Sequence, residues 1–152
     1  MSKVSINWEG NMKFVGSDDN FEVTMDAAAV YGGQNEGIRP MELMLLSVGG
    51  CTGIEVGHIL NKMRVKFDSF NIEVNGNRVD EHPKVFNNID IIYKFTGENI
   101  PEQKVNKALQ LAAEVYCSAA NMVNKTAKMN YKYEINGVVY EYVPSEESTT
   151  DN

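Results

Sequence analysis

The two cysteines are the residues whose chemistry most constrains what this chain can do. Cys51 directly follows Gly49 and Gly50, where missing side chains would leave its sulfur open on one side. Cys117 comes just before Ser118 at an expected helix start, where backbone amides and the helix dipole favour a thiolate. Taken alone, each is more simply a small buried hydrophobe. One cysteine in each of two helices that should face each other makes a thiol pair geometrically possible.

Charged residues on both sides of Cys51 could tune its reactivity. Arg39 could stabilise a thiolate and hold a peroxide oxygen, with Glu42 fixing the guanidinium in place. The alternative is a charge pair that caps a helix at the surface. Glu55 and His58 follow Cys51 by four and seven residues, on a similar helical face. They could modulate the thiol, although polar residues near a helix end are more often merely solvated.

Other common catalytic motifs are missing from the sequence. His58 and His82 are far apart and lack Cys-x-x-Cys spacing, which makes a poor zinc site, so we expect no metal. The sequence has no Gly-rich phosphate loop, no Gly-x-Ser-x-Gly elbow and no dinucleotide fingerprint. We therefore expect no cofactor.

The composition is that of one globular domain. Of 152 residues, 43% are hydrophobic and 23% charged, which are ordinary globular values. The net charge of −7, without a Lys/Arg cluster, argues against a nucleic-acid partner. The first residues lack the apolar core of a secretory signal, and the most apolar stretch, 41–48, is too short to span a bilayer. We expect a cytoplasmic protein with free thiols and no membrane partner.

The pattern of apolar residues predicts an α+β fold. Alternation predicts strands over 4–8, 12–15, 21–25, 65–79 and 85–95, and a final hairpin over 129–135 and 138–143 around Asn136-Gly137. Pro101 opens a second helical region, in which Ser118 could cap a fresh helix. We expect one domain over 1–143, followed by an acidic, disordered tail over 144–152.

The element expected to position Cys51 is a long helix from Pro40 to about Met63. Its first half is apolar on nearly every side, the pattern of a helix buried all round. Gly49, Gly53 and Gly57 form a stripe that costs about 1 kcal/mol of helix propensity per residue. The stripe indicates close approach of another backbone, most simply a second helix, unless the helix is flexible or broken. One sheet covers one side only, so we expect a homodimer.

Three motifs, in this order along the chain, resemble the OsmC/Ohr family. They are the stretch 39–53, which contains Cys51, then Glu81-His82-Pro83-Lys84-Val85-Phe86, then Tyr116-Cys117-Ser118. The resemblance runs over about residues 8–135. It implies an OsmC-like α+β fold in which antiparallel sheets wrap long central helices in an intertwined homodimer.

The resemblance also implies a thiol-dependent peroxidase acting on organic hydroperoxides. The cysteine matching Cys51 would attack the peroxide and become a sulfenic acid, and the cysteine matching Cys117 would resolve it to a disulfide. A small or protein-bound dithiol would then reduce the disulfide.

The chain departs from the family pattern at the activating residues. The family glutamate directly follows the proline, where this chain has Met41, and Glu42 comes one residue later, a turn of about 100° on a helix. The family arginine comes from the early hairpin region, where 16–20 contains none, and Arg39 or Arg78 could substitute. The alternative is a noncatalytic OsmC-like protein that binds a small apolar ligand at its dimer interface.

Overall fold

The computed structural model describes residues 2–145 and divides the chain into two compact units. The first unit is Met1–Met44 and the second is Leu45–Asn152. The tail expected over 144–152 lies outside the described residues from position 146 onward.

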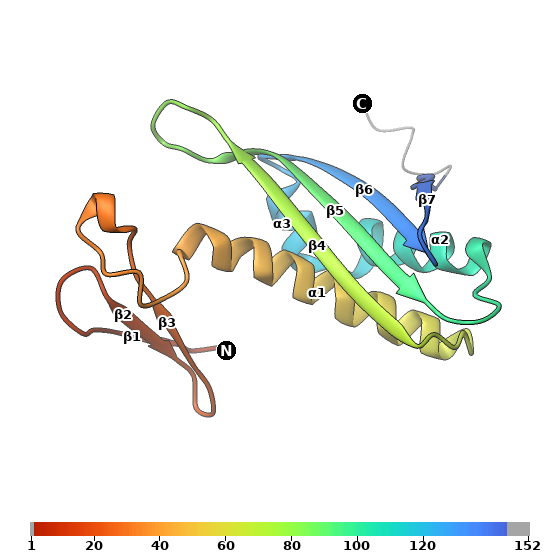
Figure 1. The fold of residues 1–152 in the computed structure, drawn as a ribbon, viewed down its shortest axis with the longest axis horizontal. Coiled ribbons are helices and arrows are strands. Elements are labelled where there is room, and N and C mark those ends of the chain that lie inside the picture. Colours follow the sequence, from red (N-terminus) through yellow and green to blue (C-terminus); the bar gives the residue numbers. More distant parts are fainter. Residues whose placement is uncertain (1, 146–152) are drawn as a thin grey trace. The chain divides into compact units, whose positions relative to one another are not determined.

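The first unit contains a three-stranded antiparallel meander (Figure 1). Strands β1 (Ser5–Trp8), β2 (Phe14–Ser17) and β3 (Glu22–Met25) pair in sequence order. A short 3-10 helix, η1 (Ala29–Tyr31), lies in the loop that follows β3. These three strands were predicted from the alternation of apolar and polar residues, and the prediction is confirmed.

The loop after β3 is organised by the buried carboxylate of Asp26. This side chain is 3% exposed and accepts hydrogen bonds from the backbone N–H groups of Ala27 at 2.7 Å, Gln34 at 2.8 Å and Glu36 at 3.1 Å. The hydrogen bond from Glu36 is the largest of the effects that lower the pKa of Asp26 against the opposing effect of burial. An ionised carboxylate therefore holds the loop that follows β3 in place.

The second unit is built on a four-stranded sheet of order β4-β5-β6-β7 (Figure 1). Its strands are β4 (Ser69–Arg78), β5 (Phe86–Thr96), β6 (Lys128–Ile135) and β7 (Val138–Glu141). The outer pairs are antiparallel, whereas β5 and β6 are parallel, because the connection between them carries helices. Asn136 and Gly137 both adopt positive φ, at 51° and 83°, as a two-residue hairpin turn requires. The predicted final hairpin is confirmed.

The helices of the second unit lie on one face of this sheet (Figure 1). They are the part of α1 (Pro40–Lys62) that begins at Leu45, then α2 (Glu102–Leu111), the π-helical turn η2 (Ala112–Tyr116) and α3 (Ser118–Val123). Alternate residues of β5 point into this layer, so that Ile89, Ile91, Tyr93 and Phe95 are all buried. The predicted α+β class and the predicted helix from Pro40 are confirmed.

One face of α1 packs against the sheet and another is open in the described chain. Val48, Thr52 and Val56 recur every fourth residue and are at most 1% exposed. Leu46 and Ile54, on the same helix, are 59% and 74% exposed. A single chain thus covers one side of α1 only, as we expected for one sheet, and burial of the helix all round stays a prediction that needs a second copy. Exposed apolar side chains of this kind typically mark a surface that a partner buries.

By length and composition alone, α1 could cross a membrane. Its most apolar window of 18 residues has a mean hydropathy of 1.5, and 33% of that window is buried. The core helix of a globular protein passes the same test, so the expectation of no membrane partner stays a prediction.

The glycine stripe of α1 faces strand β4 rather than a second helix. A Cβ built on Gly49 would lie 2.9 Å from Cγ2 of Val74, and one built on Gly53 would lie 2.6 Å from Cδ1 of Ile72. A Cβ on Gly57 would meet nothing within 4 Å. The first two glycines do have a close neighbour, but it is a side chain of β4, whereas we expected the backbone of a second helix.

This packing makes the two later glycines unequal. We expect Gly53→Leu to overpack the contact with Ile72 and to lower the free energy of unfolding by about 1 to 3 kcal/mol. Gly57→Leu adds the same side chain at a position where the described chain has open space, so the free energy of unfolding should fall by less. Chemical denaturation of both variants measures the difference. Equal losses would mean that the stripe also packs against something other than β4.

Candidate functional site

Cys51 and Cys117 are neighbours in the second unit although they are far apart in sequence. Both are free thiols, with Cys51 half-buried and Cys117 buried. The Cys51 thiol lies close enough to Cys117 to act on it electrostatically and through a hydrogen bond. The helix α1 brings one cysteine to this place, and the break between η2 and α3 brings the other.

The position of Cys51 along the sheet is fixed by its neighbour Thr52. Oγ1 of Thr52 and the hydroxyl of Tyr93 on β5 lie 2.7 Å apart, and both residues are 0% exposed. Burial raises the pKa of Tyr93, so its hydroxyl keeps its proton. Leaving one buried partner of such a pair unsatisfied costs about 1 to 3 kcal/mol. This hydrogen bond therefore anchors α1 on the sheet one residue from Cys51.

Cys117 is the N-cap of α3. Its backbone is extended, with φ −74° and ψ 101°, and its Sγ accepts the backbone N–H of Ala120 at 3.4 Å. Its own N–H donates to the carbonyl of Ala112 at 2.8 Å, at the end of the π-helical turn. The sequence suggested Ser118 as the cap, and the structure corrects this by one residue.

The pKa of Cys117 is raised although the residue lies at a helix start. Burial is the largest effect and raises this pKa to about 11, while the hydrogen bond from Ala120 acts in the opposite direction and the Cys51 thiol raises it further. The backbone amides of Ala119 and Ala120 do favour the thiolate, as expected, but desolvation of the fully buried Cys117 outweighs both. At neutral pH Cys117 is a neutral thiol.

The elements that carry the cysteines also carry exposed apolar side chains. These are Leu46 and Ile54 on α1, Val115 and Tyr116 on η2, and Met122 on α3. Single exposed apolar residues are common on protein surfaces. Several exposed apolar residues on the elements that carry the two cysteines indicate an interaction surface.

Arg39 and Glu42 lie in the first unit and are held by local hydrogen bonds. Nη1 of Arg39 donates to the carbonyls of Asp26 and Gly37, at 2.9 Å each, and Nη2 donates to Oδ1 of Asn35. Glu42 accepts the backbone N–H of Arg39 at 3.2 Å, which closes the first turn of α1. Glu42 therefore caps the helix, whereas we expected it to hold the guanidinium.

Glu55 and His58 line a cavity of about 410 Å³ together with Leu111 and Tyr116. Glu55 is one helical turn beyond Cys51, and Tyr116 directly precedes Cys117. Polar and apolar side chains thus share this cavity next to the residues that carry the thiols.

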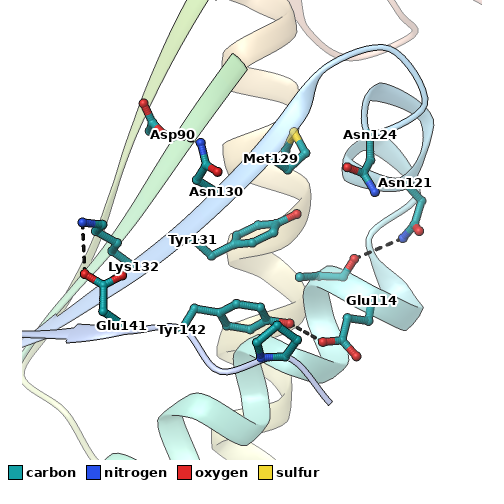
Figure 2. Close-up of a pocket in the computed structure, with 12 residues that line it drawn as sticks. Asp90, Glu114, Asn121, Asn124, Met129, Asn130, Tyr131, Lys132, Glu141 and Tyr142 are labelled. Atoms are coloured by element: carbon teal, nitrogen blue, oxygen red, sulfur yellow. Dashed lines mark hydrogen bonds and ion pairs between the residues drawn. The ribbon is translucent and has the colours of Figure 1, made fainter. Parts of the chain in front are cut away.

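A larger cavity, of about 640 Å³, lies between the hairpin β6–β7 and the segment η2–α3 (Figure 2). Asn121 forms part of its wall, and the Asn121 side-chain amide donates to the carbonyls of Cys117 at 2.9 Å and Ala113 at 3.3 Å. The sequence analysis missed the principal lining residues, among them Glu114, Tyr131 and Tyr142. No local motif marks them, because the chain brings them together only through the sheet and the crossover.

Among residues 2–145, no group of three or more His, Cys, Asp or Glu side chains is arranged to hold a metal ion. The arrangement that the second unit offers for chemistry is therefore the pair of thiols with its adjoining cavities.

Comparison with known proteins connects this arrangement to one family. The family model described as "OsmC-like protein" matches residues 33–132, a span that contains both cysteines. The Escherichia coli (strain K12) protein named "Protein YhfA" is 30% identical over 131 residues, which are 86% of this chain and 95% of that protein.

Two solved structures share the fold. A hypothetical protein from Aquifex aeolicus VF5 superposes with a TM-score of 0.80 at 30% identity, over 90% of this chain and 96% of its own. A protein from Legionella pneumophila, named as an organic hydroperoxide resistance protein OsmC, superposes with a TM-score of 0.66 at 14% identity, over 89% of this chain and 96% of its own.

The unequal environments of the two thiols predict unequal alkylation. Each cysteine can be measured alone, Cys51 in the variant Cys117→Ser and Cys117 in the variant Cys51→Ser. In native protein at pH 8, we expect iodoacetamide to label Cys117 at least tenfold more slowly than Cys51. With a pKa of about 11, only about one Cys117 thiol in 1000 is ionised at pH 8, and the thiolate is the form that reacts.

Raising the pH toward 11 should accelerate the labelling of Cys117 while the protein stays folded. In denaturant, both variants should react at similar rates, which serves as the control. Equal rates in the native state would contradict the burial of Cys117.

Proposed function

Because this chain belongs to the OsmC-like family, we propose that it is a thiol-dependent peroxidase that reduces organic hydroperoxides. The observation that carries the proposal is the meeting of a half-buried and a buried free thiol, Cys51 and Cys117, in the second unit. The Legionella pneumophila protein named for organic hydroperoxide resistance shares this fold and supports the proposal.

In the proposed reaction, Cys51 is the attacking residue. Its thiolate attacks one peroxide oxygen, the O–O bond breaks, and the products are a sulfenic acid on Cys51 and an alkoxide, which takes up a proton to become the alcohol. The half-buried position of Cys51 in α1 supports this assignment, since a substrate needs access to the sulfur. Arg39 remains the predicted source of positive charge for the thiolate, with Glu42 holding the Arg39 backbone.

Cys117 is the proposed resolving residue. Its sulfur attacks the sulfenic sulfur of Cys51, a disulfide forms, and the sulfenic oxygen leaves as water with the Cys117 proton. The burial of Cys117 supports the resolving role, because this sulfur is kept from the peroxide and meets only Cys51, and its thiol loses its proton as it attacks. A dithiol reductant then restores both thiols and is itself oxidised to a disulfide.

We also propose a homodimer as the cover for the open face of α1. The exposed apolar residues near the thiols include Ile54 on α1, Tyr116 on η2 and Met122 on α3. A second copy would bury these side chains and restrict access to the two thiols.

Single-turnover trapping of the sulfenic acid tests the assigned roles. We expect no sulfenic acid in Cys51→Ser, an accumulating sulfenic acid on Cys51 in Cys117→Ser, and slower formation in Arg39→Met. The rate should fall about tenfold for each 1.4 kcal/mol of thiolate stabilisation that the guanidinium supplies.

The parent protein should form a reversible Cys51–Cys117 disulfide after one equivalent of peroxide, and peptide mapping detects it. Equal trapping in Arg39→Met and the parent would remove Arg39 from the mechanism. No trapping with several alkyl hydroperoxides would favour the noncatalytic alternative, an OsmC-like protein that binds a small apolar ligand.

Native mass spectrometry at micromolar concentration tests the dimer. We expect a dimer for the parent and a shift toward monomer for Ile54→Glu, because a buried unpaired carboxylate is unfavourable at an apolar interface. Val85→Glu is the matched control, since Val85 is also exposed but lies in the loop before β5. A stable monomer in the parent, or equal dissociation of both variants, would refute the proposed interface.

A further inference from the structure

The stripe of α1 that carries Cys51 also carries charged side chains of both signs. Glu55, His58 and Lys62 follow this cysteine by four, seven and eleven residues, which keeps the whole set within about 60° around the helix. Along the helix axis, Glu55 is about 6 Å and Lys62 about 17 Å beyond Cys51. The stripe therefore leads from the thiol past an acid to a base.

Glu55, His58 and Lys62 form one wall of a groove, which we call the α1 groove. The other wall contains Leu111 at the end of α2 and Tyr116 at the end of η2, directly before the second cysteine. The volume of the groove is about 410 Å³, within the range of about 300 to 1,000 Å³ typical of ligand sites. All of its lining belongs to the second unit. The α1 groove thus starts beside the residues that carry the thiols and runs toward the end of α1.

The α1 groove also has an apolar lining. Ile59, which is 7% exposed, and the half-buried Met63 come from α1 and lie in the same groove as Leu111. Apolar surface gains free energy when a ligand removes it from water, and the flexible thioether of a methionine adapts to different shapes. A ligand with an aliphatic part therefore fits this lining.

The charges of the α1 groove are separated by sign and lack ion-pair partners. Within residues 2–145, neither the half-buried Glu55 nor the exposed Lys62 takes part in an ion pair. At the far end of the groove, Nζ of Lys104 donates to the carbonyl of Met63 at 3.1 Å and adds a second positive charge. The end toward Cys51 is thus negative and the far end is positive. A ligand with an ammonium group at one end and a carboxylate at the other complements both ends.

We propose that the α1 groove binds short zwitterionic peptides and thereby directs the protein to the hydroperoxides of such peptides. The choice of hydroperoxide rests on the proposed chemistry of Cys51. The peptide ammonium would pair with Glu55 and the carboxylate with Lys62, about 10 Å further along the helix. About three extended residues span this distance. A peroxide group on the side chain of the first residue would then lie toward Cys51.

The reaction of such a peptide follows the proposed peroxidase step. The O–O bond of the peptide hydroperoxide breaks, and the sulfur of Cys51 takes one oxygen and is oxidised to a sulfenic acid. The peptide keeps the other oxygen as an alcohol, which receives the proton of the thiol. The peptide chain itself stays intact, so the groove has to hold the two peptide ends only while the side chain reacts.

A nuclear magnetic resonance titration with the unoxidised tripeptide Leu-Gly-Gly tests binding without any peroxide. We expect saturable shifts of the backbone amide signals from Glu55 to Lys62. N-acetyl-Leu-Gly-Gly amide has the same chain without the end charges and should bind about fivefold or more weakly. Equal affinity for the two peptides, or shifts spread over residues outside the groove, would overturn the inference.

Sulfenic acid formation in the Cys117→Ser protein tests the substrate class. The probes carry a hydroperoxide on the tertiary carbon of the leucine side chain, in Leu-Gly-Gly and in its acetylated amide. Glu55→Gln should slow the reaction of the zwitterionic probe about fivefold more than that of the uncharged probe, and Lys62→Gln should act alike. Glu98→Gln is the matched control, because it removes the same charge from an exposed position outside the groove and should leave both rates unchanged.

The two measurements separate this inference from the proposed peroxidase activity. Saturable binding of Leu-Gly-Gly without sulfenic acid from any hydroperoxide, tert-butyl hydroperoxide included, would refute the peroxidase and leave the peptide site standing. Reaction of both peptide probes at equal rates in the parent would overturn the peptide site while the peroxidase stands. Equal effects of Glu55→Gln and Glu98→Gln on the zwitterionic probe would also overturn it, since they would show only the general charge of the protein.

Discussion

The buried hydrogen bond between Thr52 and Tyr93 fixes where α1 lies on the sheet, and the thiol pair depends on that position. Both side chains are 0% exposed, so neither hydroxyl can exchange its partner for water. A shift of α1 by one residue would break this bond and turn Cys51 by about 100° around the helix. Cys51 precedes Thr52 directly, and it is half-buried beside Cys117 only in the observed register.

The competition between burial and helix geometry decides the chemistry of Cys117. A helix N-terminus typically stabilises a nearby negative charge by about 0.3 to 1 kcal/mol at the surface. Raising the pKa of this thiol from 9.0 to about 11 corresponds to roughly 3 kcal/mol against the thiolate. Desolvation therefore outweighs the helix start, and the two cysteines differ in environment, because Cys51 is half-buried in a long helix and Cys117 is the buried N-cap of a short one.

Periodicity in the sequence predicted the elements well, and it predicted their partners less well. The helix from Pro40 and the hairpin at Asn136-Gly137 follow from local signals, and both are found. The glycine stripe of α1 was seen, but periodicity tells only that residues share a face, not that this face meets β4. The role of Asp26 could not be predicted, because its main partners are backbone groups eight to ten residues away, which carry no sequence signal. Two helices expected to face each other made a pair of Cys51 and Cys117 possible, and the family resemblance then implied a role for each cysteine.

The thiol pair and the cavity between β6–β7 and η2–α3 share a wall, since both are built on the short crossover segment that runs from η2 into α3. The π-helical turn ends at Tyr116, Cys117 is extended, and α3 begins one residue later. Asn121 joins the two sites, because its amide bonds the carbonyl of Cys117 while its side chain lines the cavity. A continuous α-helix over 102–123 would not leave Cys117 extended at an N-cap position. The break between η2 and α3 thus leaves the buried N-cap Cys117 on one side of this segment and the cavity on the other.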